Sequence, residues 1–196
     1  AYECGDTVAE LCNKGKLHPL CSKIFRDEKT GKSFRLYRHQ QEAIETVLDG
    51  KHVIVTSGTG SGKSLTYLIP VFDHILKHQP HEHRVHAVVV YPMNALINSQ
   101  VEAIERLLKN LDAEASPIRV ARYTGQEDQD TREHLRRHPP HVLLTNYMML
   151  ELMLARPRDR ALVSQDSIHF LVLDEIHTYR GRQGADVAVL VRRLRE

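Results

Sequence analysis

The 196-residue chain has no tryptophan, and aromatic residues of all kinds make up only 6% of it. It has no apolar run near the roughly 20 residues that a membrane-spanning helix needs. Its first residues lack the basic-then-apolar pattern of a secretory signal. Hydrophobic residues still account for 41% of the sequence, which is too many for a disordered chain. We therefore expect a globular domain with an aliphatic core and no membrane partner.

Neither sign of charge dominates, because 27 Lys and Arg residues face 25 Asp and Glu residues. A balance of this kind does not by itself identify a nucleic-acid partner. Cysteine is scarce and odd in number, with Cys4, Cys12 and Cys21 only, which favours a reducing compartment and a cytoplasmic protein. With His18 these residues offer a Cys3His zinc set, but the irregular spacing lacks a C-x2-C pair and favours free thiols.

Short apolar runs alternate with amphipathic segments from about residue 36 onward. Residues 1–35 show no clear periodicity, and we expect them to form a loop-rich extension before a domain at 36–196. The pattern predicts strands at 52–56, 87–91, 118–123, 142–145 and 168–173, and helices at 41–48, 63–77, 95–108, 127–137, 147–154 and 185–194. Pro70 predicts a kink or a break in one helix. The alternation predicts an α/β fold with a mostly parallel sheet and helices on both faces.

The strongest chemical motif is Ser57-Gly58-Thr59-Gly60-Ser61-Gly62-Lys63-Ser64, between an expected strand and an expected helix. This context is typical of a phosphate-binding loop, whose small residues turn backbone N–H groups toward a phosphate at the helix N-terminus. We expect Lys63 to reach the β and γ phosphates and Ser64 to bind Mg²⁺. Ser57 replaces the first glycine of the strict pattern and is small enough for the turn.

A second G-K-S sequence, Gly31-Lys32-Ser33, serves as an internal comparison. A charged segment precedes it in place of an apolar strand, and no glycine stands two residues before Gly31. We expect a surface turn there and no phosphate site.

Two adjacent acids, Asp174 and Glu175, follow the apolar run at 170–173. A phosphate-binding loop needs a carboxylate at the end of a neighbouring strand to hold Mg²⁺, and Asp174 fits that role. Glu175 points elsewhere and is the candidate general base for the attacking water. Such a pair alone is also common in turns.

The sequence Asp174-Glu175-Ile176-His177 is a D-E-x-H box, and with residues 57–64 it resembles the first motor domain of superfamily 2 DExH-box helicases. The resemblance implies a RecA-like P-loop domain that uses ATP and Mg²⁺, with His177 as part of the catalytic box. It also implies that Gln40, in a segment similar to the Q motif, recognises adenine. The alternative, from its position alone, is that Gln40 is simply a helix-start residue.

Three further segments resemble the nucleic-acid-binding motifs of this superfamily, and each follows an expected strand. Their candidate contact residues are Pro92, Asn94, Gln100, Thr124, Gly125, Thr145 and Asn146. Ligands bind at the carboxyl edge of an open α/β sheet, and hydroxyl and amide groups there suit sugar–phosphate contacts. Turn formation or helix N-capping explains each segment equally well when it is taken alone.

Residues 177–186 look like the MrfA-like branch of bacterial and fungal DNA helicases. The resemblance implies a DNA helicase or translocase that acts on single-stranded or partly duplex DNA, with RNA not excluded. It further implies a second RecA-like motor domain that carries an arginine finger and is absent from these 196 residues. The alternatives are a P-loop NTPase or kinase of another class, or a non-catalytic nucleic-acid-binding module.

Overall fold

The computed structural model describes residues 3–56, 62–78, 82–111, 116–164, 168–179 and 182–194. The chain forms two compact units, one of Ala1–Pro80 with Arg106–Pro117 and the other of His81–Glu105 with Ile118–Glu196. Each unit is described by itself. The expected boundary between residues 35 and 36 stays a prediction.

The first unit begins with two short strands and two short helices, so residues 1–35 are not the loop-rich extension that we expected. Its elements are β1 (Cys4–Thr7), α1 (Val8–Asn13), α2 (Pro19–Ile24), β2 (Arg35–Tyr37), α3 (Arg38–Leu48) and α4 (Ser64–His78). β1 pairs antiparallel with β2. Thr7 and Glu10 form a capping box at the start of α1, and Pro19 occupies the first turn of α2. These local signals start helices too short to show a periodic pattern.

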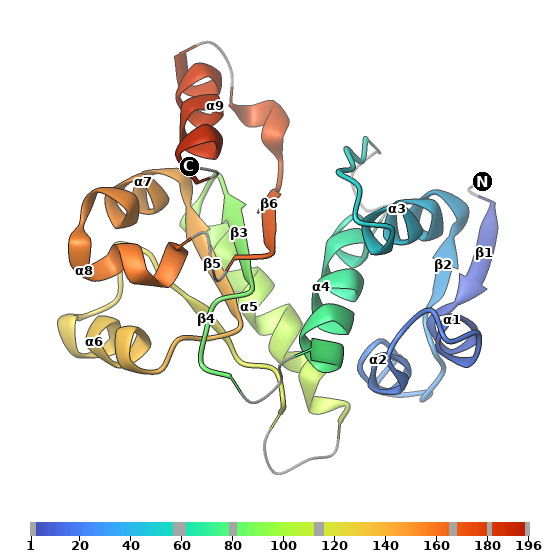
Figure 1. The fold of residues 1–196 in the computed structure, drawn as a ribbon. Coiled ribbons are helices and arrows are strands. Elements are labelled where there is room, and N and C mark those ends of the chain that lie inside the picture. The colour runs from blue at the N-terminus through green and yellow to red at the C-terminus, as the bar shows by residue number, and fades with distance from the viewer. Residues whose placement is uncertain are drawn as a thin grey trace. The chain divides into compact units, whose positions relative to one another are not determined.

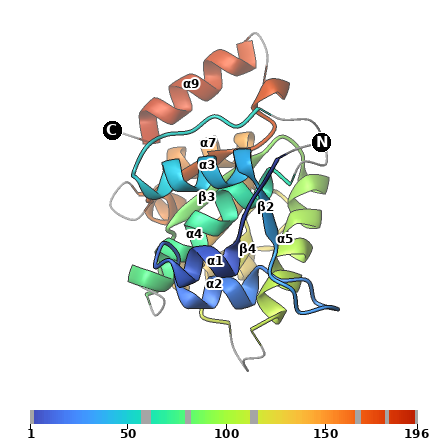
Figure 2. The same ribbon diagram turned by 90° about the vertical axis from the view of Figure 1, so that its right-hand side faces the viewer.

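In the first unit, α2 packs beside α4, as Figure 1 and Figure 2 both show. Phe25, directly after α2, packs against Phe72 of α4 with ring centroids 5.6 Å apart. Asp73 of α4 is buried and accepts hydrogen bonds from the His18 backbone at 2.5 Å and from Lys77 Nζ at 2.9 Å. The N-terminal segment is thereby fastened to the helix that follows the phosphate loop.

One expectation for the first unit is wrong, and a second is tested only in part. The β-branched run at 53–55 is not a strand, and Ile54 is 85% exposed. A strand needs a hydrogen-bonded neighbour, and no described strand pairs with this run. Helix α4 continues through Pro70 without a break, and a kink at that position stays a prediction. Proline removes one helical hydrogen bond, but the buried neighbours Ile69 and Val71 hold the helix in place.

The second unit contains a four-stranded parallel sheet with the order β4-β5-β3-β6. The strands are β3 (Ala87–Tyr91), β4 (Val120–Arg122), β5 (Val142–Asn146) and β6 (Phe170–Leu173). The helices are α5 (Asn94–Lys109), whose residues from Arg106 onward are counted with the first unit, α6 (Gln129–Arg137), α7 (Tyr147–Ala155), α8 (Pro157–Arg160) and α9 (Arg182–Leu194), with short 3-10 turns η1 (Ala161–Val163) and η2 (Ile176–Thr178). In the central strand β3, Val88 pairs with Leu143 on one side and Leu171 on the other. The parallel α/β fold expected from the alternating pattern is confirmed.

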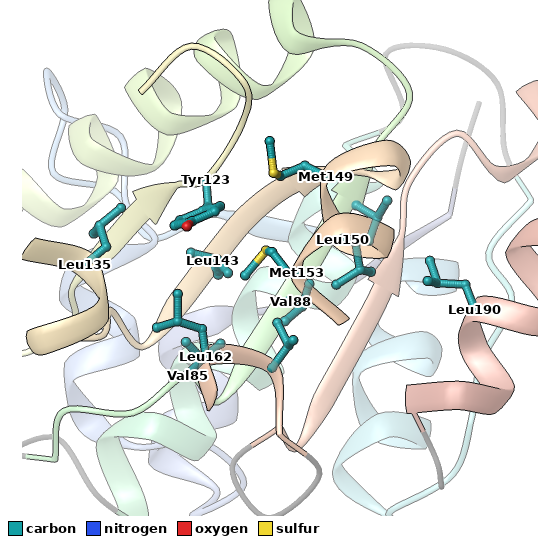
Figure 3. Close-up of a cluster of buried hydrophobic side chains, with 12 residues drawn as sticks. Val85, Val88, Tyr123, Leu135, Leu143, Met149, Leu150, Met153, Leu162 and Leu190 are labelled. Carbon is teal, nitrogen blue, oxygen red and sulfur yellow. The ribbon is translucent and has the colours of Figure 1, made fainter. Parts of the chain in front are cut away.

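A buried cluster of the second unit joins the sheet to α6, α7 and α9. Figure 3 shows Tyr123 and Leu143 from the sheet against Met149 and Met153 of α7, with Leu135 of α6 nearby. All five side chains are buried.

The last residues of β3, β4, β5 and β6 lie at the same edge of the sheet because all four strands are parallel. The polar segments that follow these strands therefore gather at one edge, as the sequence predicts. Within the described parts of the chain, no helix has the length and apolar character needed to cross a membrane.

Candidate functional site

The acidic pair follows β6 directly. The Asp174 backbone N–H donates to the Val90 carbonyl at 3.0 Å, which continues the ladder with β3 by one residue. Asp174 Oδ1 then accepts the N–H of Glu175 at 2.8 Å. Glu175 has φ 51° and ψ 38°, and among the described non-glycine residues it alone has a positive φ. A left-handed conformation costs a side-chain-bearing residue about 1–2 kcal/mol, and such strain clusters at functional sites.

The turn after Glu175 holds this conformation. The Glu175 carbonyl accepts hydrogen bonds from Thr178 N at 2.9 Å and Thr178 Oγ1 at 2.8 Å. His177 Nδ1 lies 3.2 Å from Glu175 Oε2. The Asp174 carboxylate is thus linked to the Glu175 backbone, and the Glu175 carboxylate lies beside the His177 ring.

Tyr179 is a residue near this box that the sequence argument did not single out. Burial and the nearby Asp174 carboxylate raise the pKa of its phenol, so the hydroxyl stays protonated and able to donate. Its ring lies 6.3 Å from the ring of Tyr147. A Cβ added at Gly184 would lie 3.1 Å from the Tyr179 carbonyl oxygen, so the glycine allows α9 to begin beside this segment.

Asn94, Thr145 and Asn146 come together at the carboxyl edge. Asn146 Nδ2 donates to Asn94 Oδ1 at 2.8 Å, while Asn146 Oδ1 caps α7 through Met149 N at 2.8 Å. Thr145 is buried, and its hydroxyl donates to the Tyr123 carbonyl at 2.6 Å. The N-capping alternative therefore holds for Asn146, whose amide also bridges two of the expected motifs.

The loop after β4 is closed by a side chain that the sequence argument missed. The Glu127 carboxylate accepts from the backbone N–H of Thr124 and from its hydroxyl at 2.9 Å. Thr124 is fully buried, whereas the neighbouring Gly125 is exposed. The spacing T-x-x-E is a turn-closing signal that was visible in the sequence.

Pro92 and Gln100 are half-buried. Gln100 lies six residues after Asn94 on α5, so the two project from different faces of the helix. Asn98, one turn after Asn94, shares its face and accepts from Arg122 Nη1 at 2.5 Å. The structure thus brings Asn94, Thr124, Thr145 and Asn146 to one edge and leaves Gln100 apart from Asn94.

In the first unit, Gln40 contacts the end of the phosphate-loop motif. Gln40 is only 2% exposed; its Oε1 accepts Tyr37 N at 2.8 Å, and its Nε2 donates to the Gly62 carbonyl at 3.0 Å. The helix-start role is confirmed, because Gln40 occupies the third position of a capping box on α3. Its recognition of adenine stays a prediction.

Lys63 and Ser64 stand at the beginning of α4, and both are half-buried. The Lys63 carbonyl accepts from Thr66 N at 2.9 Å and from Thr66 Oγ1 at 2.6 Å, which fixes the first turn. The other expected phosphate-binding residues, Gly58, Thr59, Gly60 and Ser61, lie outside the described residues. The second G-K-S sequence is a surface turn, as predicted, with Gly31 at φ +66°.

The zinc alternative finds no support in the described parts of the chain, where no group of three or more His, Cys, Asp or Glu residues is arranged to hold a metal. All three cysteines are free. Cys12 Sγ donates to the His18 carbonyl at 3.3 Å, and burial raises the pKa of the Cys21 thiol.

Comparisons with known proteins find helicases among the relatives of the chain. The ATP-dependent helicase hrq1 of Schizosaccharomyces pombe is 30% identical over 90% of the chain, which spans 16% of that protein. The Druantia protein DruE of Escherichia coli is 26% identical over 82% of the chain, which spans 15% of it. The chain therefore spans less than a fifth of either relative.

The fold matches a solved structure of the helicase MrfA, bound to DNA and AMPPNP, with a TM-score of 0.79. The match has 24% sequence identity and covers 99% of the chain and 26% of MrfA. The model of the DEAD/DEAH box helicase family matches residues 37–196, so the chain belongs to this family of helicases.

Proposed function

We propose that the chain is the ATP-binding motor domain of a DNA helicase or translocase, which couples ATP hydrolysis to movement on nucleic acid when it is joined to a second RecA-like domain. One observation carries the proposal. The D-E-x-H box and three polar loops leave one edge of a parallel sheet, and hydrogen bonds such as Asn146–Asn94 and Asp174–Val90 tie neighbouring strands together there. The residues proposed for ATP hydrolysis and those proposed to bind the nucleic-acid backbone then lie at the same edge of one sheet.

The proposed nucleotide site is built on the phosphate-loop motif and Gln40. The phosphates are proposed to be bound by the backbone N–H groups of Gly58, Thr59, Gly60, Ser61 and Gly62. Lys63 supplies the positive charge that faces these phosphates. Gln40, at the Q-motif position, contacts Gly62 and is proposed to recognise adenine.

A magnesium ion fits the donor set, because a carboxylate and a hydroxyl oxygen are ligands that this ion prefers. Asp174 follows β6 with one carboxylate oxygen already oriented by the Glu175 N–H, and Ser64 opens α4. When bound, Mg²⁺ neutralises charge on the transferred phosphoryl group. We propose Asp174 and Ser64 as its protein ligands.

Glu175 is the proposed general base. Its carboxylate accepts the proton of the attacking water, and the adjacent His177 ring holds it in position. Two hydrogen bonds from Thr178 to the Glu175 carbonyl support its strained conformation.

The proposed nucleic-acid face consists of Pro92, Asn94, Gln100, Thr124, Gly125, Thr145 and Asn146. Their roles differ, because Thr124 and Thr145 are buried and engaged with the protein, whereas Gly125 is exposed and Asn94 and Asn146 are half-buried. We assign backbone contact to the accessible residues and loop support to the two threonines. Contacts of this kind position a strand without reading its sequence.

Single-stranded or partly duplex DNA is the proposed partner. Among the solved structures of similar fold, MrfA is bound to DNA, and the DEAD-box helicase Mss116 is bound to single-stranded RNA. RNA is therefore the competing substrate to test. We also propose a cytoplasmic location, on the ground that the three cysteines carry no disulfide.

The test is steady-state ATP hydrolysis by the longest natural chain that contains residues 1–196, with and without single-stranded DNA or RNA. We expect hydrolysis that DNA stimulates, and much slower hydrolysis by residues 1–196 alone, because an arginine finger contributes about 10³–10⁵ in rate. Guanine selectivity, or phosphate transfer to a small molecule, would instead favour a P-loop enzyme of another class. DNA-stimulated turnover of about 1 s⁻¹ or more by residues 1–196 would show that they form a complete motor.

A further inference from the structure

The buried carboxylate of Glu127 organises the loop after β4. The side chain is 3% exposed, and it accepts the Thr124 N–H, the Thr124 hydroxyl at 2.9 Å and Arg122 Nε at 2.9 Å. Burial of a carboxylate is costly unless it is paired and hydrogen-bonded. The donors are Thr124 in the loop and Arg122 at the end of β4, so the Glu127 carboxylate holds the loop and the strand end together.

The partner of this carboxylate, Arg122, is the last residue of β4 and remains 41% exposed. Tyr123 points into the core beneath α6 and α7, so Arg122 faces the opposite side of the sheet. There its Nη1 donates to Asn98 of α5 at 2.5 Å. The guanidinium is held from two directions, at the same edge as the bonded pair Asn94 and Asn146.

A guanidinium group has five N–H donors in a planar fork. The bonds to Glu127 and Asn98 use Nε and Nη1. The remaining N–H donors of the Arg122 guanidinium are on a partly exposed group whose orientation these two bonds fix. A guanidinium oriented in this way is well suited to bind phosphate oxygens.

We propose that Arg122 binds the nucleic-acid backbone phosphate at this edge, and that Glu127 is the positioning residue that holds its guanidinium and the Thr124–Gly125 turn in register. The inference rests on the proposed function, since it assumes that this edge binds nucleic acid. It adds a cation to a set of predicted contacts that were otherwise neutral.

A simple count of charge makes the opposite prediction for Glu127. Removing a negative charge near a phosphate should tighten binding, and Glu127 would then act as an internal competitor of the nucleic acid. If Glu127 acts by positioning Arg122, its replacement by glutamine should weaken nucleic-acid binding. The glutamine side chain has one acceptor oxygen for the three donors from Thr124 and Arg122, and its NH₂ group cannot accept from them. The sign of the effect separates the two roles.

The first measurement is the binding of a fluorescein-labelled single-stranded oligonucleotide, by anisotropy across a salt series, to the longest natural chain containing these residues. We expect R122A to weaken binding about 5- to 20-fold and to lower the salt slope by about 0.7, the value for one phosphate contact on a single strand. The matched control is R137A, which removes an exposed arginine of α6 that pairs with Glu133. It should leave both quantities near those of the wild type.

The second measurement compares E127Q with D130N, which makes the same change of charge at an exposed position of α6. We expect E127Q to weaken binding several-fold and D130N to leave it unchanged or slightly tighter. In the double variant R122A/E127Q the two losses should not add, because both act through one guanidinium. A purely structural role for Glu127 would give additive losses.

Three results would distinguish a failure of the proposed function from a failure of the role of Arg122 or of Glu127. A wild-type protein that binds no nucleic acid overturns the proposed function itself. Wild-type binding with R122A equal to R137A overturns only the role of Arg122. Tighter binding by E127Q, or additive losses in the double variant, overturns the positioning role. If R122A does not fold, R122K replaces it; it keeps the charge and loses the fork, and wild-type binding by that variant would count against the proposal.

Discussion

The side-chain amide of Gln40 donates a 3.0 Å hydrogen bond to the carbonyl of Gly62, 22 residues further along the chain. Gly62 has φ +68°, and a Cβ built there would lie 2.6 Å from Gln40 Nε2. The glycine is therefore required both by its backbone conformation and by the approach of Gln40. Helix α3 and the end of the phosphate-loop motif are joined through this one buried amide.

Gln40→Ala should weaken ATP binding as well as the fold. The change leaves the Tyr37 N–H and the Gly62 carbonyl without their partner, and we expect a loss of about 1–3 kcal/mol in the free energy of unfolding. Urea unfolding and calorimetric ATP titration measure the two effects. Gln41→Ala is the control, because Gln41 bonds Asp6 and Glu45 and should lose stability only. Wild-type ATP affinity in Gln40→Ala would contradict the prediction.

Lys63→Ala should abolish ATP–Mg²⁺ binding and leave the fold intact, because the ammonium supplies the positive charge that faces the phosphates. Isothermal titration calorimetry measures the affinity, and circular dichroism checks the fold. The chain offers a matched control in Lys32→Ala, which changes the other G-K-S sequence, at an exposed turn. Equal ATP affinity in the two variants would remove the phosphate-loop assignment.

Glu175→Gln should still bind ATP but turn it over about 10²–10⁴-fold more slowly, the usual loss for a general base. The amide keeps the shape of the side chain but cannot accept the proton of water. Steady-state ATPase of the longest natural chain, together with ATP affinity, separates turnover from binding. Glu133→Gln, on the exposed face of α6, should have no effect on either. Turnover near that of the wild type would assign the base elsewhere.

His141 should make the second unit less stable in acid. The ring is buried and neutral: Nδ1 accepts Arg119 N–H at 3.0 Å, and Nε2 faces the Glu82 carbonyl at 2.8 Å. Burial, the Arg119 guanidinium, and His86 and His83 lower its pKa to about 4 from 6.5, against the raising effect of the Glu82 carbonyl.

Because the folded pKa lies below the unfolded pKa, the unfolded chain binds the proton first. The contribution is complete above pH 6.5 and is lost as the pH falls toward 4, by about 2–3 kcal/mol. Urea unfolding of the wild type and His141→Asn between pH 7.5 and 4 measures the loss as the difference between the two slopes. His138→Asn, at an exposed histidine, should keep the wild-type slope. The same slope in His141→Asn would refute the assignment.

The sequence predicted the parallel sheet because buried strands of such a sheet are continuous apolar runs. Val88, Val89 and Val90 form one of these runs, and β3 ends at Tyr91, where the polar segment begins. The acidic pair was found for the same reason, since it follows an apolar run directly. Asp174 and Glu175 could therefore be placed at the edge of the sheet from the sequence alone.

The errors came from segments whose structure depends on a neighbour. The run at 53–55 has the composition of a strand but no described partner, and composition does not reveal pairing. Helices α1 and α2 are too short for a periodic signal. The ion pair between Arg122 and Glu127 was missed because it forms only when the turn between the two residues is closed. The T-x-x-E spacing that indicates this turn was present in the sequence.

The inward direction of the Thr124 and Thr145 side chains changes how a saturation mutagenesis map of this protein should be interpreted. Both side chains are buried at the edge where the nucleic-acid contacts are proposed, so their replacement will first lower the abundance of folded protein in the cell. Asn94 and Asn146, which are half-buried at the same edge, will instead separate abundance from activity. A screen that scores growth alone would count all four as equivalent.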